Sequence, residues 1–222
     1  MDFQAARRAM VDGQLRTSEV NHPGLIAAML DIPREVFLPG DQTALAYLDR
    51  DLMIADATAT EPARYLMKPA VLARLIQAAD PAQHERALVL GAGSGYAAAV
   101  MSRLAAAVVA LESNDSLARQ ARSVLPSLGC ENVTVVEGPL AGGVPGSGPY
   151  DVILIDGGVE TLPEELCGQL SSHGRLVAAV GHGPVGKATL FQCVNGKLSG
   201  RVLFGANAPV LPGFDVAPIF VF

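Results

Sequence analysis

Residues 86–100, with the sequence RALVLGAGSGYAAAV, constrain the fold of this chain more than any other stretch. An apolar run at 87–90 ends in a loop that contains Gly91, Gly93 and Gly95, and an alanine-rich segment follows. Glycines let the backbone take positive φ values and approach a ligand closely, and the start of the following helix favours a negative group. The stretch therefore predicts a strand, a ligand-binding loop and a helix within an open α/β sheet.

Short apolar runs and helical segments alternate after this loop. We predict strands at 87–90, 107–111, 133–136, 151–155 and 175–180, and helices at 95–104, 113–127 and 161–170. Thr161 and Glu164 have the spacing of a capping box for the last of these helices. Strands that are apolar throughout and separated by helices predict a parallel sheet that is covered on both faces.

The two ends of the chain depart from this alternation. In residues 1–80 we predict helices at 3–11, 22–33 and 68–79, and a long ordered loop at 37–62. Near the other end, the Asn195-Gly196 pair between two strand-like runs predicts a hairpin, and a last strand is predicted at 217–222. The expected fold class is α/β, a Rossmann-like open and mostly parallel sheet with an N-terminal helical region and an antiparallel C-terminal tail.

The spacing inside the glycine loop separates three kinds of nucleotide site. The dinucleotide fingerprint G-x-G-x-x-G/A requires a small residue where this chain has Tyr96, which disfavours a nicotinamide-dependent oxidoreductase. The Walker pattern fails because no Lys-Ser/Thr pair follows the loop. G-x-G-x-G is the usual loop for S-adenosylmethionine. Glu112, 21 residues beyond Gly91, stands where an acid accepts the ribose hydroxyls. We therefore expect a nucleoside site.

Composition and charge exclude several other classes of function. The formal net charge is −6 and no Lys/Arg cluster occurs, so we expect no nucleic-acid partner. Cys130, Cys167 and Cys193 are far apart, and we interpret them as buried apolar side chains in a reducing cytoplasm. No Cys/His pairing has metal-ligand spacing, so we expect no metal site. We also expect no export signal and no membrane span, and hence a cytoplasmic protein.

Several motifs occur in the order and spacing of one enzyme family. They are MVDGQL, IPREVFLPG, AYLDRDL, GAGSGYAAAV, PYDVILIDG and GRLVAAVG. On these motifs the chain resembles the protein-L-isoaspartate O-methyltransferases over nearly its full length. The resemblance implies a class I methyltransferase fold, S-adenosylmethionine as donor, and repair of proteins or peptides by methylation of isoaspartyl carboxylates. It also implies that residues 1–80 form the substrate side and that residues 81–222 form the S-adenosylmethionine-binding domain.

The donor site is altered relative to the family pattern. The resemblance implies donor contacts from Gly91, Ala92, Gly93, Gly95, Glu112 and Gly138. Val89 stands where the family has an acid two residues before the first glycine, and Pro139 replaces the acid of a Gly-Asp-Gly motif. Proline has neither a carboxylate nor a backbone N–H. Of three acids expected near the donor, Glu112 would be the one that remains.

The substrate segment has two alternative alignments. The family carries Thr-Ile-Ser-x-Pro, in which the serine hydroxyl helps to place the isoaspartyl group. Counted back from Gly91, Met67 replaces that serine, whereas counted forward from Tyr47, Thr60 supplies the hydroxyl. Asp156, at the end of a predicted strand, is a further candidate on the substrate side. The competing hypothesis is a degenerate or redirected member that binds a nucleoside or a partner without isoaspartyl methylation.

Overall fold

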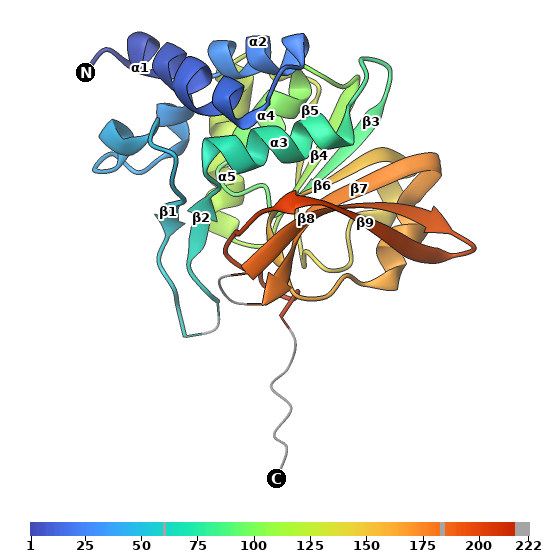
Figure 1. Cartoon of the computed structure of the whole chain (residues 1–222). Coiled ribbons are helices and arrows are strands. Elements are labelled where there is room, and N and C mark those ends of the chain that lie inside the picture. The colour runs from blue at the N-terminus through green and yellow to red at the C-terminus, as the bar shows by residue number, and fades with distance from the viewer. Residues whose placement is uncertain (60, 183–184, 216–222) are drawn as a thin grey trace.

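The computed structural model describes residues 1–59, 61–182 and 185–215. Its central sheet has the strand order β5-β4-β3-β6-β7-β8-β9 (Figure 1). The strands are β3 (Arg86–Leu90), β4 (Ala107–Glu112), β5 (Val133–Glu137), β6 (Tyr150–Val159), β7 (Leu170–His182), β8 (Val185–Val194) and β9 (Lys197–Gly205). The first five strands in this order, β5, β4, β3, β6 and β7, pair in parallel. Strands β8 and β9 then join the edge of the sheet in antiparallel pairing. The predicted open, mostly parallel α/β sheet with an antiparallel tail is confirmed.

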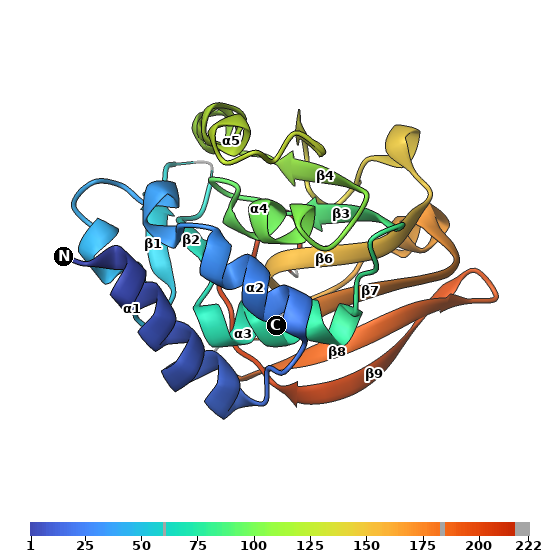
Figure 2. The same cartoon turned by 90° about the horizontal axis from the view of Figure 1, so that it is seen from above.

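Helices cover one face of this sheet in two layers. They are α1 (Phe3–Met10), α2 (Pro23–Asp31), α3 (Pro69–Ala79), α4 (Tyr96–Ser102) and α5 (Asp115–Ser127). Helices α3, α4 and α5 contact the strands, while α2 packs on α3 and α4 from outside and α1 packs on α2. Seen from above in Figure 2, α2 lies across α3 in front of the sheet, and α1 lies beside α2.

The sheet separates two apolar cores. Along β3, Val89 points into the core on the helix side, whereas Leu90 points into the core on the opposite face. That opposite core is closed by the 3-10 turn η6 (Glu164–Gln169) and by Leu211 and Phe214 from the segment after β9. Because both faces of the strands are buried, their sequences are apolar throughout, as expected for a covered parallel sheet.

Some predicted elements have a different form in the structure. The helix predicted at 161–170 is wrong, because the segment forms only the 3-10 turn η6 after Pro163. Strand β7 already begins at Leu170, so too few residues remain for an α-helix, and the expected capping box has no helix to cap. The loop predicted at 37–62 contains the 3-10 turn η4 (Thr43–Leu45) and strand β1 (Leu52–Ala55).

Strand β1 pairs with β2 (Arg64–Leu66) in a separate two-stranded ribbon. Helix α1 continues into the π-turn η1 (Val11–Leu15) and the 3-10 turn η2 (Arg16–Ser18). The hairpin is confirmed, since Asn195 and Gly196 have φ values of 51° and 78° between β8 and β9. The strand predicted at 217–222 lies outside the described residues.

The interpretation of all three cysteines as reduced, buried side chains is wrong for two of them. Cys167 in η6 and Cys193 in β8 form a disulfide with their Cα atoms 5.2 Å apart, whereas Cys130 is buried and free. The two cysteines are 26 residues apart in the sequence, so no local pattern predicted the pair. It forms because β8 folds back beside β7 and passes close to η6.

Reduction of this disulfide should lower the free energy of unfolding by about 2–4 kcal/mol, because the cross-link restricts the unfolded chain. Urea unfolding with and without a thiol reductant measures the effect. A Cys167→Ala/Cys193→Ala double variant serves as control, since its midpoint should not respond to reductant. Equal midpoints for the wild-type chain in both buffers would contradict the prediction.

Candidate functional site

The glycine loop lies where the strand order of the sheet reverses. Strand β3 stands between β4 and β6, and ligands of open α/β sheets bind at this switch point, beyond the carboxyl ends of the strands. Gly91, Gly93 and Gly95 have φ values of 75°, 56° and 107°, which side chains rarely tolerate. The loop thus has the backbone conformation that its glycines predicted, and helix α4 begins directly after it.

Residues of the N-terminal region support this loop from the helix side. The Ser94 hydroxyl donates to the carbonyl oxygen of Phe37 at 2.6 Å. The Phe37 ring packs edge-on against Tyr96, with ring centroids 5.5 Å apart. All three side chains are buried completely, so the loop conformation depends on the packing of the N-terminal region.

The carboxylate of Glu112 is held beside the loop by main-chain donors. Glu112 ends β4 and is 0% exposed. Its Oε2 accepts from the Gly93 N–H at 2.6 Å, and its Oε1 accepts from the N–H groups of Ser113 and Asn114 at 2.9 Å each. The structure therefore brings together Glu112 and Gly93, two residues that the sequence assigned to one nucleoside site.

Arg64 is a site residue that the sequence analysis missed. Its guanidinium forms an ion pair with both oxygens of Glu112, through Nη1 to Oε1 and through Nη2 to Oε2 at 3.0 Å. Nη2 also donates to the Gly91 carbonyl at 3.3 Å, and the residue is only 3% exposed. The two partners are 48 residues apart. The one sequence feature that could have indicated Arg64 is its position as the single charged residue in the stretch Ala-Arg-Tyr-Leu-Met at 63–67.

The protein's own side chains fill the space over the glycines. A Cβ atom on Gly91 would lie 2.6 Å from Cδ1 of Leu211, and one on Gly93 would lie 2.8 Å from Cδ1 of Ile54. Ala92, between these glycines, is 1% exposed. The glycines therefore make room for Leu211 and Ile54 as well as for the turn.

A cavity of about 500 Å³ opens beyond the ends of β4 and β5, next to Ser113, and the fully buried Glu112 is not among the described residues that line it. Among the residues that line it are Ser113, Glu137, Gly138 and Pro139. An anchored carboxylate next to a cavity of this size fits the hydroxyls and base of a nucleoside, provided that Arg64 gives up Glu112. Val89, where the family pattern has an acid, is instead fully buried in the helix-side core.

Arg64 also lines a narrow pocket of about 10 Å³, together with other residues that include Met67, Asp156, Gly157 and Leu211. This volume is close to the minimum for one water molecule. Met67 is 2% exposed, and its carbonyl oxygen accepts from Arg34 Nη2 at 2.6 Å. Thr60, the alternative hydroxyl, lies outside the described residues.

Asp156 contributes a buried carboxyl group to the same pocket. It lies where the pairing of β6 with β7 shifts register between Leu154 and Gly158, an irregularity of the kind that re-aims side chains near sites. Burial raises the pKa of the Asp156 carboxyl to about 7, against the lowering effect of the Arg34 and Arg64 charges. Its Oδ1 has no hydrogen-bond partner in the described part of the chain. This carboxyl can therefore take up or release a proton near neutral pH.

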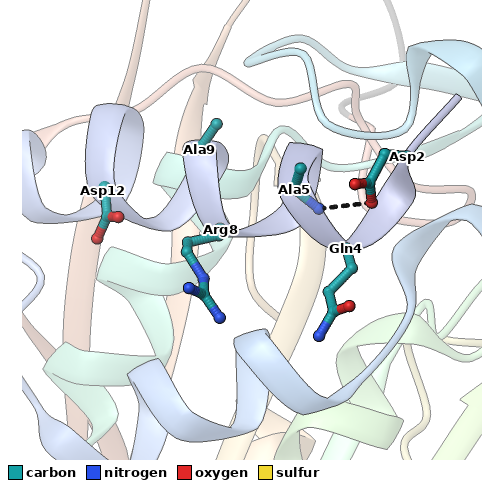
Figure 3. Close-up of a pocket in the computed structure, with 6 residues that line it drawn as sticks. All are labelled: Asp2, Gln4, Ala5, Arg8, Ala9 and Asp12. Carbon is teal, nitrogen blue, oxygen red and sulfur yellow. Dashed lines mark hydrogen bonds between the residues drawn. The ribbon is translucent and has the colours of Figure 1, made fainter.

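A third hollow, of about 490 Å³, lies at the N-terminal helix. It is lined by Asp2, Gln4, Ala5, Arg8, Ala9 and Asp12. Figure 3 shows these side chains on α1 and its continuation, with the Asp2 carboxylate capping the helix at the Ala5 N–H, 3.0 Å away. We interpret it as the solvated face of an amphipathic helix.

Neither a membrane-crossing helix nor a cluster suited to a metal ion occurs among the described residues. No helix at 1–59, 61–182 or 185–215 is both long and apolar enough to cross a membrane. Within the same ranges, no group of three or more His, Cys, Asp or Glu residues is placed to hold a metal ion.

Two known proteins with similar sequences carry the same activity in their names. The protein-L-isoaspartate O-methyltransferase of Pelotomaculum thermopropionicum is 41% identical over 175 residues, which are 79% of this chain and 74% of that protein. The enzyme of the same name from Methanoregula boonei is 39% identical over 79% of this chain and 78% of its own length.

Solved structures agree with the sequence matches. A structure of a protein-L-isoaspartate O-methyltransferase superposes with a TM-score of 0.81 at 29% identity, covering 93% of this chain and 66% of that chain. A putative enzyme of this kind from Plasmodium falciparum, in complex with S-adenosyl-L-homocysteine, has a TM-score of 0.72 and covers 95% of this chain and 98% of its own. At 18% identity, that second likeness shows the fold alone.

The match is also general for the family rather than limited to single relatives. Residues 5–205 match the sequence model described as protein-L-isoaspartate(D-aspartate) O-methyltransferase, a span that contains the glycine loop, Glu112 and Asp156. The fold with its switch-point loop, the sequence identities and this span together place the chain in the protein-L-isoaspartate(D-aspartate) O-methyltransferase family.

Proposed function

We propose that this chain transfers a methyl group from S-adenosylmethionine to the carboxylate of isoaspartyl residues in proteins or peptides. The observation that carries the proposal is the buried Glu112 carboxylate, anchored by three backbone N–H groups beside the glycine loop, in a chain of this family. The proposed donor contacts are Gly91, Ala92, Gly93, Gly95, Glu112 and Gly138. Residues 1–80 are proposed as the acceptor side and residues 81–222 as the donor-binding domain.

The main requirement of this reaction is that the protein positions the methyl donor and the acceptor carboxylate. S-adenosylmethionine supplies an electrophilic methyl group on a sulfonium. The acceptor carboxylate is already ionised at neutral pH, so no side chain has to remove a proton. The chain's residues bind both partners, hold them in line and exclude water, and such alignment accounts for most of the rate. The choice between Thr60 and Met67 for the position of the family's serine is therefore a matter of acceptor binding rather than of acid–base chemistry.

The test has two stages. Calorimetric titration with S-adenosylhomocysteine should give micromolar binding, because the product probes the donor site without an acceptor. Methyl transfer is then compared on two peptides that differ only in an isoaspartyl or an aspartyl linkage, and only the first should be methylated. Donor binding without this discrimination would support the redirected member that Val89, Pro139 and Met67 suggest. No binding at millimolar product would reject the donor site.

We further propose that the enzyme works in the cytoplasm. Because thiol-reducing systems keep most cysteines reduced there, the Cys167–Cys193 disulfide is the feature that this location puts to the test, and immediate alkylation of cell extracts measures the fraction of the pair that is oxidised. Fractionation of cells that express the full chain tests the location directly.

A further inference from the structure

Arg64 joins the acceptor side of the site to the donor side. It lies on β2, between Thr60 and Met67, the two alternative positions for the serine with which the family places its acceptor. Its guanidinium nevertheless ends on the donor side, at Glu112, the Gly91 carbonyl and the Ser113 hydroxyl. A nucleoside that used Glu112 would have to displace this guanidinium, since both of its outer nitrogens contact the carboxylate.

Glu112 keeps its position without Arg64. The N–H groups of Gly93, Ser113 and Asn114 all donate to it, and these donors are fixed by the glycine loop and by the start of α5. Arg64, in contrast, belongs to a two-stranded ribbon separate from the main sheet (Figure 1). When the ion pair opens, the guanidinium is therefore the partner that moves and the carboxylate is the partner that stays.

Buried polar groups with unused hydrogen-bonding capacity lie on the acceptor side. We define the buried polar cluster as Arg34, Arg64, Tyr96 and Asp156. Arg34 Nη1, the Tyr96 hydroxyl and Asp156 Oδ1 have no hydrogen-bond partner within the described ranges. The Arg34 guanidinium lies over the Tyr96 ring, 4.8 Å from its centroid. Arg34 and Tyr96 interact electrostatically with each other, but neither supplies a partner for Asp156 Oδ1. Buried polar groups are nearly always satisfied, so the unused capacity here indicates a place where a polar ligand completes the structure.

The charges of the buried polar cluster specify the ligand. Arg34 and Arg64 bring two positive charges, and both are almost completely buried. Asp156 adds at most one negative charge, and none while it is protonated, so the cluster keeps a net positive charge. Once Glu112 is engaged by a nucleoside, the Arg64 guanidinium needs another anion, because an unpaired buried charge is costly. A carboxylate suits it best, since guanidinium and carboxylate form two parallel hydrogen bonds. A carboxylate also has about four lone-pair sites, so it can accept these bonds and keep a lone pair for attack.

We propose that Arg64 is an acceptor-binding residue, which pairs with Glu112 in the structure described here and turns to the isoaspartyl carboxylate when the donor's ribose hydroxyls take Glu112. The inference rests on the proposed function and names the group that replaces the family's serine hydroxyl. In the transfer, one acceptor oxygen forms a bond to the methyl carbon and the sulfur–methyl bond breaks. Its electrons remain on the sulfur, the sulfonium becomes a neutral thioether, and no proton moves.

Arg64→Gln and Arg64→Lys test the proposal against wild type in two binding assays. Calorimetry with S-adenosylhomocysteine should show equal or tighter binding to Arg64→Gln, because the competitor for Glu112 is gone. Anisotropy of a labelled isoaspartyl peptide, measured with saturating S-adenosylhomocysteine, should show binding weakened by about tenfold or more, as expected for a lost charge-assisted hydrogen bond. Arg64→Lys keeps the charge but not the planar pair of guanidinium donors, so its peptide affinity should lie between those of wild type and Arg64→Gln.

Arg175→Gln is the matched control. Arg175 also forms a mostly buried ion pair, with Glu85, and its side chain is 16% exposed. That pair lies at the amino ends of the strands, next to the start of β3. The variant should lower the melting temperature without changing either binding constant. If Arg64→Gln proves unfolded by its melting curve, Arg64→Lys carries the comparison.

The outcomes separate the inference from the proposed function. Weaker S-adenosylhomocysteine binding to the Arg64 variants would overturn the inference, because Arg64 would then support the donor. Unchanged peptide binding would overturn it as well. If wild type binds S-adenosylhomocysteine but does not distinguish isoaspartyl from aspartyl peptide, the proposed acceptor fails and the acceptor role of Arg64 fails with it. Wild-type turnover with an unaffected Arg64→Gln peptide affinity would leave the function intact and remove the inference alone.

Discussion

Replacement of Glu112 by alanine should lower the free energy of unfolding by about 3–5 kcal/mol, the cost of breaking a buried pair at one side. The variant leaves the Arg64 guanidinium, only 3% exposed, without its anion. It also leaves the N–H groups of Gly93, Ser113 and Asn114 without their acceptor. In the same variant, affinity for S-adenosylhomocysteine should fall by about 1–3 kcal/mol through the lost hydrogen bonds.

Urea unfolding measures the first effect and calorimetry the second. Asp31→Ala is the control: Asp31 pairs with Arg103 at 2.9 Å, but its side chain is 60% exposed, so about 1 kcal/mol or less should be lost. A Glu112→Ala/Arg64→Met double variant should recover much of the stability, since removing both charges of a buried pair is often neutral. A loss no larger than that of Asp31→Ala would contradict the buried pair.

The second large effect concerns Asp156 and is a dependence on pH. Burial raises the pKa of this carboxyl from 3.8 to about 7 in the folded chain. The folded state therefore holds the proton more tightly than the unfolded state, and stability falls as pH rises between these two values. Asp156→Asn removes this titration. Relative to the variant, wild type should lose about 2 kcal/mol between pH 5 and pH 7, since each unit is worth about 1.4 kcal/mol well below the folded pKa and less as the carboxyl ionises.

Chemical unfolding of both proteins from pH 5 to pH 9 measures this difference, which should level off above the folded pKa. Asp151→Asn, on the same strand, is the matched control. Asp151 accepts from the Arg86 N–H at 2.9 Å and from the Ser171 hydroxyl at 2.8 Å. Although burial opposes ionisation there, these bonds and the Arg175 charge lower its pKa. Its contribution is therefore lost only in acid. A flat difference between wild type and Asp156→Asn would show that Asp156 remains ionised.

Local sequence pattern predicted the parts of the fold that depend on neighbours along the chain. The apolar runs of the central strands, the glycine loop and the Asn195-Gly196 hairpin all follow from short-range preferences. The approach of Glu112 to Gly93 was also predictable, because parallel strands bring their carboxyl ends to one edge of the sheet.

The remaining features depend on contacts that no local pattern contains. Arg64 reaches Glu112 across 48 residues because a ribbon, whose first strand lies in the predicted loop at 37–62 and whose second strand follows that loop, folds over the glycines. Cys167 meets Cys193 because the antiparallel tail returns past η6. The helix predicted at 161–170 failed because its apolar residues are buried against the sheet as a short turn. In each case, tertiary packing outweighs the preference of the segment.

Leu211 has a consequence for how tightly any ligand can be held. Its methyl groups occupy the space above Gly91 and Gly157, and the same side chain closes the second core. A molecule that enters there must first expel part of the protein's interior and then replace its apolar contacts. Apparent affinity is therefore reduced by the fraction of molecules in which Leu211 has swung aside. A dissociation constant for a ligand at this position would thus report the internal packing of the protein as well as the ligand contacts.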